Sequence, residues 1–299
     1  LVNEENKIIG RITIPTDLTV PYQTLVERMA DAVRQMLENA GMTLEQCGGI
    51  GIGSPGTIDA KQGVILYSNN FGWENVPIVE ELKKHLDTRI EIANDADAAA
   101  LGEVCAGAAE GAENAVLLTL GTGVGSGVIL DKKIFRGAMP GGCELGHLSI
   151  RYDGIRCTCG RKGCLEAYAS ASALLRIARE KAAEHPESIM NEMCGNDLEQ
   201  MNGKIPFDAA KAGDEAGMET VKEYEGYLAC GIANVINTFR PEKVILGGGV
   251  AAQKDNLTAP LKDLVKDMCF GGSHGHIADI VTSVLGNDAG IIGAANLVV

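Results

Sequence analysis

Short apolar strands that alternate with helical segments constrain the fold of this chain more than any other sequence feature. A strand predicted at residues 89–93 leads into an alanine-rich helix that ends near Gly107. A strand at residues 115–120 and another at residues 243–246, which follows a long helix at residues 215–239, repeat the pattern. Alternation of this kind is typical of layered α/β folds. The sequence therefore predicts an α/β protein.

Length and composition limit the class of protein. The 299 residues exceed one typical domain, and 45% hydrophobic residues supply enough apolar surface for two lobes. A formal charge of −14 without a run of Lys or Arg argues against a surface that follows nucleic-acid phosphates. No segment approaches the roughly 20 apolar residues of a membrane span, and no secretory leader opens the chain, so we expect a cytoplasmic protein.

Periodicity and turn residues predict the remaining elements. Apolar residues recur at helical spacing from Gln23, and Gly41 is a suitable end for that helix. Asp131 and Lys132 can reverse the chain after a strand. The other predicted segments are strands near residues 50–52, 64–67, 127–130 and 277–285, and helices at residues 258–269 and 288–299.

A compact cluster of metal-binding residue types lies in the middle of the chain. His147 is followed by Cys157, Cys159 and Cys164, and one imidazole with three thiolates satisfies tetrahedral zinc. Four protein ligands leave no open position, so the predicted metal is structural rather than catalytic. The alternative is a set of unrelated thiols in a reducing compartment. The other six of the nine cysteines are interpreted as small apolar residues.

Asn94 and Asp95 follow a predicted strand and precede a predicted helix. Either residue is a good helix N-cap, which is one interpretation of the pair. The carboxyl end of a strand in an α/β sheet is also where substrates bind, and a carboxylate there can accept a proton from a hydroxyl group. Position alone leaves both interpretations open.

Three glycine-rich segments are candidates for nucleotide contacts. Residues 51–56 match the dinucleotide pattern G-x-G-x-x-G, but Pro55 and the residues that follow predict a turn and a hairpin instead of the required helix. Residues 121–127 and 247–249 offer close backbone approach to phosphates, and plain turns are the alternative. Neither a P-loop motif nor a protein-kinase catalytic loop occurs in the sequence.

Two acidic residues flank the cysteine segment. Glu144 precedes His147 by three residues, and Glu166 follows Cys164 by two. A solvated surface position is the usual one for Glu. Next to a metal loop, however, both carboxylates would be held on a rigid frame, which suits groups that bind sugar hydroxyls.

With these residues considered together, the sequence resembles the ROK family (repressor, open reading frame, kinase), and within it the bacterial glucokinases, over its whole length. The resemblance is carried by residues 51–56, 94–103, 119–123, 141–147, 164–166, 246–250 and 287–290. It implies a two-lobed actin-like ATPase fold, related to ribonuclease H, with a ligand cleft between the lobes. It also implies ATP, Mg²⁺ and a structural Zn²⁺, and a homo-oligomer such as a dimer or tetramer.

The resemblance assigns roles to individual residues. Asp95 would be the base when the γ-phosphoryl group of ATP moves to the 6-hydroxyl of glucose, and His147 would use one ring nitrogen for zinc and the other for sugar. The implied sugar-binding residues are Asn69, Asn94, Asp95, Glu144, His147 and Glu166. The implied nucleotide-binding residues are Gly121, Thr122, Gly123, Gly247, Gly248 and Gly249.

The expected domains are a small α/β domain of residues 1–99 plus 287–299 and a larger one of residues 100–286 with the zinc loop. Family members open with a strand and an Asp-x-Gly-Gly-Thr phosphate hairpin, which would lie before Leu1, so we expect the small domain to lack it. Other substrates of the family, N-acetylmannosamine, N-acetylglucosamine, mannose and fructose, stay open, although residues 164–170 resemble the glucokinases. A ROK transcriptional regulator, which would carry a helix-turn-helix before Asn3, is the alternative from another class.

Overall fold

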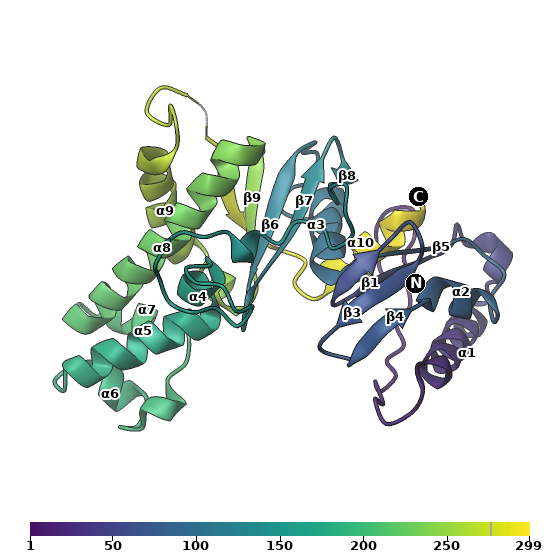
Figure 1. Ribbon diagram of the computed structural model, residues 1–299, viewed down its shortest axis with the longest axis horizontal. Helices are drawn as coiled ribbons and strands as arrows, with labels where there is room; N and C mark the ends of the chain where they lie inside the picture. Colours follow the sequence, from purple (N-terminus) through teal and green to yellow (C-terminus); the bar gives the residue numbers. More distant parts are fainter. Residues whose placement is uncertain (276) are drawn as a thin grey trace. The chain divides into compact units, whose positions relative to one another are not determined.

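The computed structural model describes residues 1–275 and 277–299 (Figure 1). The chain forms two compact units. Unit 1 comprises Leu1–Glu113, Gly127–Cys143 and Leu285–Val299, and unit 2 comprises Asn114–Ser126 and Glu144–Val284. Compactness alone defines these units, and the expected domain ranges remain a prediction.

Unit 1 contains a pair of parallel strands, β1 (Ile50–Ser54) and β5 (Ile90–Asn94). Their register places Ser54 opposite Asn94, so both strands end at the same edge. Ile52 and Ile92 are buried in the core of the unit, as expected for the apolar positions of a strand. Residues that follow these two strands are therefore brought together at one place.

Helices α1 (Tyr22–Ala40) and α2 (Ile78–Lys83) contribute to the same core. Val26 of α1 and Leu82 of α2 are almost fully buried there. Helix α1 ends where Gly41 adopts a left-handed conformation with φ 64°, which a glycine tolerates without a Cβ clash. The predicted helix from Gln23 with its glycine stop is thus confirmed.

A small antiparallel sheet follows β1 in the chain. It contains β2 (Thr57–Asp59), β3 (Val64–Ser68) and β4 (Trp73–Val76), in that order. Ile65 is fully buried in the core that this sheet shares with α1 and α2. Residues 51–54 lie within β1, which runs into this hairpin and not into a helix, so the turn and hairpin predicted from Pro55 onward are confirmed.

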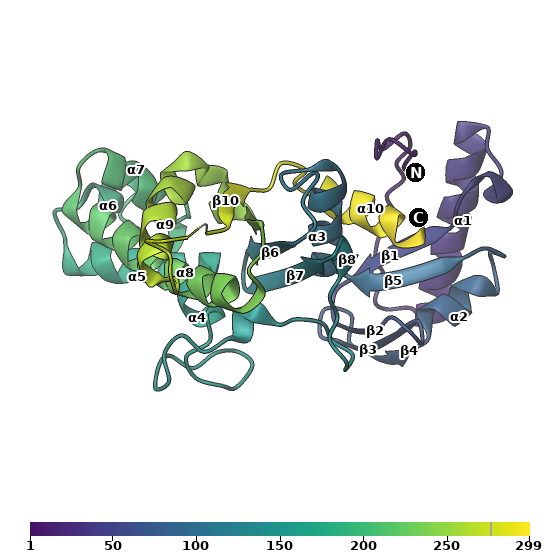
Figure 2. The same ribbon diagram turned by 90° about the horizontal axis from the view of Figure 1, so that it is seen from above.

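Helix α3 (Asp95–Ala106) packs closely on α10 (Asp288–Ala295), and the two helices lie side by side in both ribbon views (Figures 1 and 2). Glycine permits this approach. A Cβ atom on Gly293 would collide with the carbonyl oxygen of Ala98, and one on Gly102 with that of Ala289. The chain then ends in the short helix η5, Asn296–Val298.

Unit 2 is built on a parallel sheet with the order β10 (Asp279–Thr282), β9 (Lys243–Gly247) and β6 (Ala115–Leu120). Most of the β6 and β9 side chains are buried, as expected for parallel strands that helices cover. Strand β7 (Val124–Leu130) lies next to β6, begins in unit 2 and ends in unit 1, where β8 (Lys133–Ile134) pairs with it.

Helix α8 (Glu215–Phe239) is the long helix of unit 2 and has the predicted bounds. The Asp214 side chain caps its start by accepting the Gly217 N–H at 2.8 Å, and Pro241 follows its end. Against it packs α5 (Ala171–Glu184), whose start the Ser170 hydroxyl caps. The other helices of unit 2 are α4 (Glu166–Ala169), α6 (Ile189–Met193), α7 (Ile205–Lys211) and α9 (Asp255–Met268), with the 3-10 turns η2 (Leu145–His147), η3 (Leu198–Gln200) and η4 (Gly249–Gln253). The 3-10 turn η1 (Leu44–Gln46) belongs to unit 1.

Several predicted elements differ from the structure in extent, among them the C-terminal helix, which ends at Ala295 and is followed by a 3-10 turn. The glycine turn predicted at residues 121–127 is shorter, because β7 already starts at Val124, and the strand predicted at residues 277–285 is confined to Asp279–Thr282. Asp131 and Lys132 form the predicted reversal with positive φ angles of 51° and 62°. Among the described residues, no helix combines the length and apolar character needed to cross a membrane.

Candidate active site

Two of the predicted nucleotide-binding segments meet at the carboxyl edge of the unit 2 sheet. Gly121 follows β6 directly, and residues 247–249 end β9, whose Gly247 is in register with Thr119. Gly248 has φ 83° and ψ −178°, and a Cβ atom there would collide with the Leu120 carbonyl oxygen. The carboxyl edge of an α/β sheet is the usual ligand-binding edge. The structure therefore places both glycine segments where a nucleotide can bind.

The Gly121 turn is held at the start of α5. The Gly121 N–H donates to the Gly123 carbonyl oxygen at 3.0 Å, and the Ala171 N–H donates to the Gly121 carbonyl oxygen at 2.8 Å. The Ser172 hydroxyl donates to the Thr122 carbonyl oxygen at 2.9 Å. The N-terminus of a helix carries partial positive charge, so its proximity favours an anion at this turn.

Glu166 links this turn to the cysteine loop. Its Oε2 accepts the Val124 N–H at 3.1 Å, and a Cβ atom on Gly123 would collide with the same oxygen. Its Oε1 accepts the Thr158 hydroxyl at 3.0 Å and lies 3.3 Å from the Cys157 Sγ. The predicted sugar-binding carboxylate is therefore oriented from two sides.

His147 ends the short turn η2, and Glu144 directly precedes that turn. The turn packs against the first residues of β7. The Leu145 N–H donates to the buried Ser126 hydroxyl at 2.9 Å. A Cβ atom on Gly146 would collide with the carbonyl oxygen of Val124, so only glycine fits at that position. Glu144 is exposed, whereas His147 is half-buried. The turn presents both predicted sugar-binding side chains from one rigid backbone segment.

The four predicted metal ligands converge. The ligand atoms of His147, Cys157, Cys159 and Cys164 all lie within 4.8 Å of one another. The Sγ atoms of Cys159 and Cys164 are 3.7 Å apart, and Cys157 Sγ is 3.7 Å from His147 Nδ1. Tetrahedral zinc bonds of about 2.3 Å to sulfur and about 2.0 Å to nitrogen imply ligand separations of roughly 3.6–3.8 Å. The residues therefore fit a zinc ion.

The environment of the thiols differs across the cluster. Burial, together with hydrogen bonds that the Cys164 thiol donates to its neighbouring cysteines, raises the pKa of Cys164 to about 12. The Arg161 backbone N–H lowers the pKa of the exposed Cys159. Because metal binding needs thiolates, a metal ion at this site would displace the protons of these thiols.

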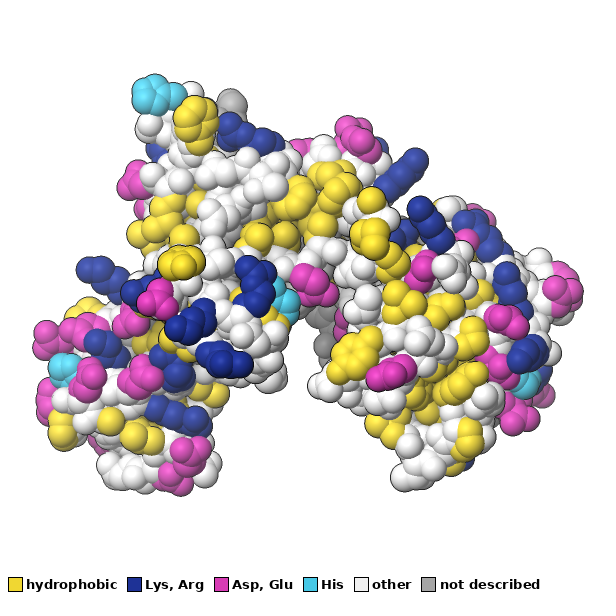
Figure 3. Space-filling view, viewed as in Figure 1, with side chains coloured by type: hydrophobic (Ala, Val, Ile, Leu, Met, Phe, Trp, Pro, Cys, Tyr) yellow, Lys and Arg dark blue, Asp and Glu magenta, His cyan; other side chains and the backbone are white. Residues whose placement is uncertain are grey.

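Basic side chains gather on the loop around the cluster and are visible over this part of unit 2 (Figure 3). Arg161 Nη1 donates to the His147 carbonyl oxygen at 3.3 Å, and Lys162 pairs with Asp153 at 3.0 Å. Zinc with three thiolates has a net charge of −1, so cations nearby offset that charge. The exposed basic residues of the loop are Arg151, Arg156, Arg161 and Lys162.

Asn94 and Asp95 lie at the carboxyl end of β5 in unit 1. The Asn94 side-chain oxygen and Asp95 Oδ1 both accept the Ala96 N–H at 2.9 Å, so the pair does cap α3. Asn94 Nδ2 donates to the Gly56 carbonyl oxygen at 3.0 Å. Asn94 is half-buried and Asp95 is exposed. Capping fixes the orientation of both side chains and leaves Asp95 accessible to a substrate.

The Gly56 turn also brings Asn69 to this edge of unit 1. A Cβ atom on Gly56, where φ is 120°, would collide with the Tyr67 carbonyl oxygen, which places the turn against the end of β3. The Tyr67 hydroxyl donates to Asn69 Oδ1 at 3.4 Å. Asn94 thus contacts the Gly56 turn directly, whereas Asn69 follows the end of β3 that lies against this turn.

Comparison with known proteins identifies the family. Residues 1–299 match the ROK family, and the chain belongs to it. A glucokinase of Thermotoga maritima is 36% identical over 299 residues, which cover 100% of this chain and 92% of the relative.

Solved structures agree with this assignment. A ROK family glucokinase from Streptomyces griseus, crystallised with glucose and AMPPNP, is 31% identical, with a TM-score of 0.79 over 99% of this chain and 93% of that one. A ROK hexokinase from Thermus thermophilus is 31% identical, with a TM-score of 0.78 over 98% and 91%. The expected actin-like ATPase fold is confirmed.

Sequence reasoning missed several residues that build the site. Ser126 holds the η2 turn, Thr158 orients Glu166, and Tyr168 contacts the cysteine loop. Each acts through a contact with a segment distant in the sequence. Hydroxyl groups of this kind carry no periodic signal, so only the folded chain reveals them.

Proposed function

We propose that this protein is an ATP-dependent hexose kinase that transfers the γ-phosphoryl group of ATP to the 6-hydroxyl of glucose. The observation that carries the proposal is the similarity to glucokinases over the whole chain. Two glycine segments at one sheet edge would bind the nucleotide. The Asn94–Asp95 pair, which caps α3, would bind the sugar and accept its proton.

Unit 2 would bind the nucleotide. The Gly121–Gly123 turn lies against the start of α5, and the partial positive charge of that helix end favours the phosphates of ATP. Residues 247–249 would contact the remaining part of the nucleotide, because Gly248 lets the backbone approach closely. Mg²⁺, when bound with ATP, would neutralise charge on the phosphoryl oxygens.

Unit 1 would supply the base. The Ala96 N–H holds Oδ1 of Asp95 and so orients the carboxylate. Transfer requires the sugar hydroxyl to be aimed at the γ-phosphorus while it loses its proton. Asp95 would hydrogen-bond that hydroxyl and accept its proton, and Asn94 with Asn69 would bind other hydroxyls of the sugar.

Glu144, His147 and Glu166 of unit 2 would bind sugar hydroxyls as well. His147 would coordinate zinc through Nδ1, which faces the Cys157 sulfur, and present Nε2 to the sugar. Zinc would then fix both the tautomer and the orientation of the ring. The role of the metal is structural, because the four protein ligands fill its coordination shell. Free thiols of this kind suit a reducing compartment, so we place the protein in the cytoplasm.

A hexose panel tests the proposal. Coupled assays with ATP and Mg²⁺ should give the highest kcat/KM for glucose among glucose, mannose, fructose, N-acetylglucosamine and N-acetylmannosamine. A clear preference for an N-acetylated sugar would keep the kinase but change its substrate. ATP turnover that no sugar in the panel stimulates would contradict the proposal.

A further inference from the structure

Tyr168 connects the helix that begins with Glu166 to the middle of the cysteine loop. Its side chain is 1% exposed, and its hydroxyl oxygen accepts the Ile155 N–H at 2.6 Å. A Cβ atom on Gly154 would collide with the same hydroxyl oxygen, so the loop backbone lies directly on it. The contact joins α4 to the cysteine loop. Both segments carry residues of the predicted sugar and metal site.

The ring of Tyr168 is held from two further sides. The Arg151 guanidinium lies 6.0 Å from the ring centroid, and the ring of Tyr227 from α8 lies 4.7 Å away, centroid to centroid. Arg151 Nη1 also donates to the Tyr227 hydroxyl at 3.4 Å. Cation–π and offset ring contacts of this type are favourable at a protein surface. They would keep Tyr168 in one orientation.

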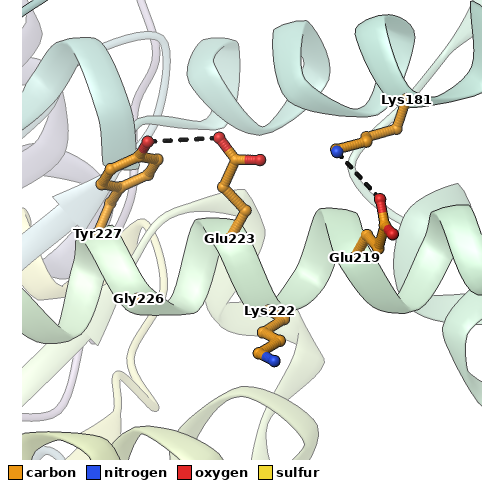
Figure 4. Close-up of a pocket in the computed structure, with 6 residues that line it drawn as sticks. All are labelled: Lys181, Glu219, Lys222, Glu223, Gly226 and Tyr227. Carbon is orange, nitrogen blue, oxygen red and sulfur yellow. Dashed lines mark hydrogen bonds and ion pairs between the residues drawn. The ribbon is translucent and has the colours of Figure 1, made fainter. Parts of the chain in front are cut away.

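Tyr227 belongs at the same time to a groove between α5 and α8 (Figure 4). Its hydroxyl donates to Glu223 Oε1 at 3.4 Å, and Lys181 pairs with Glu219 at 3.0 Å farther along the groove. Tyr227 is itself a residue of the long helix α8, and its bond to Glu223 restrains the ring that packs on Tyr168. The cysteine loop is in this way connected to the main helical layer of unit 2.

Ile155 connects the Tyr168 contact to the predicted metal ligands. Its carbonyl oxygen accepts the Gly163 N–H at 2.8 Å, next to Cys164, and Cys157 lies two residues farther along the loop. The pairing of Ser149 with Cys164 and of Arg156 with Lys162 closes the rest of the loop. A displacement of Ile155 would therefore shift ligands on both arms of the loop.

We propose that Tyr168 is a positioning residue that holds the cysteine loop in its metal-binding shape and in register with Glu166. This proposal rests on the proposed function, because the position of Glu166 beside the cysteine loop matters there for sugar binding. The hydroxyl of Tyr168 fixes Ile155, and the backbone of the same helix holds Glu166 two residues earlier. Tyr168 is not one of the predicted sugar-binding or metal-binding residues, so it would act only through Ile155 and Glu166.

Tyr168→Phe tests the proposal because it keeps the ring and removes only the acceptor. A single hydrogen bond of this type predicts about threefold to tenfold faster exchange of the Ile155 amide and about threefold to tenfold faster zinc release to a chelator. Both are measured on zinc-loaded protein without sugar or ATP. In turnover, KM for glucose should rise by a similar factor while kcat stays within about twofold. Arg151→Gln should change the same quantities in the same direction.

Tyr224→Phe is the matched control. The Tyr224 hydroxyl donates to the Ala169 carbonyl oxygen at 2.8 Å, so this variant loses an equally short buried bond to the same helix without touching the loop. It should lower the Tm and leave zinc release unchanged. Wild-type release and exchange in Tyr168→Phe, or equal acceleration in Tyr224→Phe, would overturn the proposal. Because neither measurement needs turnover, a failure of the kinase proposal would remain distinguishable.

Discussion

Asp95 caps α3, and this role is compatible with the proposed role as a base, although the sequence presented the two as alternatives. Its Oδ1 shares the Ala96 N–H with the Asn94 side chain, so the residue contributes to the cap of α3. The same hydrogen bond restricts rotation of the carboxylate, and the residue remains exposed. A cap and a base are therefore compatible in one side chain.

Asp95→Asn separates the two roles. Asn caps a helix about as well as Asp, so stability should change little, whereas the basicity is lost. General-base assistance is worth roughly 10²–10⁴-fold in rate, and we expect kcat to fall at least about a hundredfold with a modest change in sugar affinity. Steady-state kinetics with both substrates saturating measure the effect. A kcat near that of the wild type would remove Asp95 from the mechanism.

Glu225 is a buried carboxyl group of α8 that the proposed chemistry does not use. It is 6% exposed, its Oε1 has no hydrogen-bond partner among the described residues, and burial raises its pKa to about 7. An unfolded Glu has a pKa of about 4.3, so the folded state binds the proton more tightly. The free energy of unfolding should therefore fall as the pH rises from about 4.5 through 7.

Glu225→Gln should remove this part of the pH dependence and raise stability at pH 8, because a neutral amide replaces a buried charge. Denaturant unfolding between pH 5 and 8 measures the slope. Glu223→Gln, on the half-buried face of the same helix, is the control and should keep it. An unchanged slope in Glu225→Gln would contradict the assignment.

At the scale of elements, the end of β9 depends on a glycine conformation. Gly248 lies in a backbone region that is essentially restricted to glycine, against the end of β6. Gly248→Ala should destabilise the protein by about 1–3 kcal/mol and raise KM for ATP more than KM for glucose. Gly226→Ala, in α8, is the control, because a Cβ atom there also meets no atom within 4 Å and the residue is outside the proposed nucleotide site. Equal effects of both substitutions would contradict a specific role for Gly248.

The cysteine loop makes a prediction about metal content. About one zinc per chain is expected in freshly reduced protein, and Cys159→Ser should lose it and weaken glucose binding through His147. Cys47→Ser, at a half-buried position of unit 1, should retain the metal. Elemental analysis with a glucose titration provides the measurement. Metal-free wild-type protein that binds glucose normally would exclude the structural role.

Local signals explain which elements could be predicted. Helix α8 was predictable because Asp214 and Pro241 flank a long periodic segment. Helix α6 has five residues, too few for a periodic signal, and its start depends on the Ser188 cap. Gly127 stands where the predicted glycine turn meets the strand predicted at residues 127–130. It lies within β7, where a Cβ atom would collide with the Ala100 side chain, so packing and not chain reversal requires glycine there.

The residues of the candidate site could be predicted from the sequence, but not all of their contacts. The spacing of the cysteines indicated the cluster, and the structure brings all four ligands together. The position of Glu166 against Gly123 could not be predicted, because it depends on how α4 packs beside the β6–β7 turn. The sequence therefore identified the reactive groups, while their orientation required the fold.

At the scale of the whole molecule, each unit carries a part of the proposed chemistry. In unit 1, Asn94 contacts the Gly56 backbone turn and shares the cap of α3 with Asp95. Unit 2 places two glycine segments at the edge of its sheet and supports them with Glu166 and the cysteine loop. Similarity to glucokinases over the whole chain supports one activity for these parts, transfer of a phosphoryl group from ATP to a sugar.

Transfer to the 6-hydroxyl of glucose is the central claim, and a comparison of glucose with 6-deoxyglucose tests it most directly. Both sugars present the same remaining hydroxyls, but only glucose offers the acceptor. With ATP labelled at the γ-phosphorus, glucose should yield labelled glucose 6-phosphate, whereas 6-deoxyglucose should act as a competitive inhibitor without labelled product. Labelled 6-deoxyglucose, or no labelled product from glucose, would contradict the account.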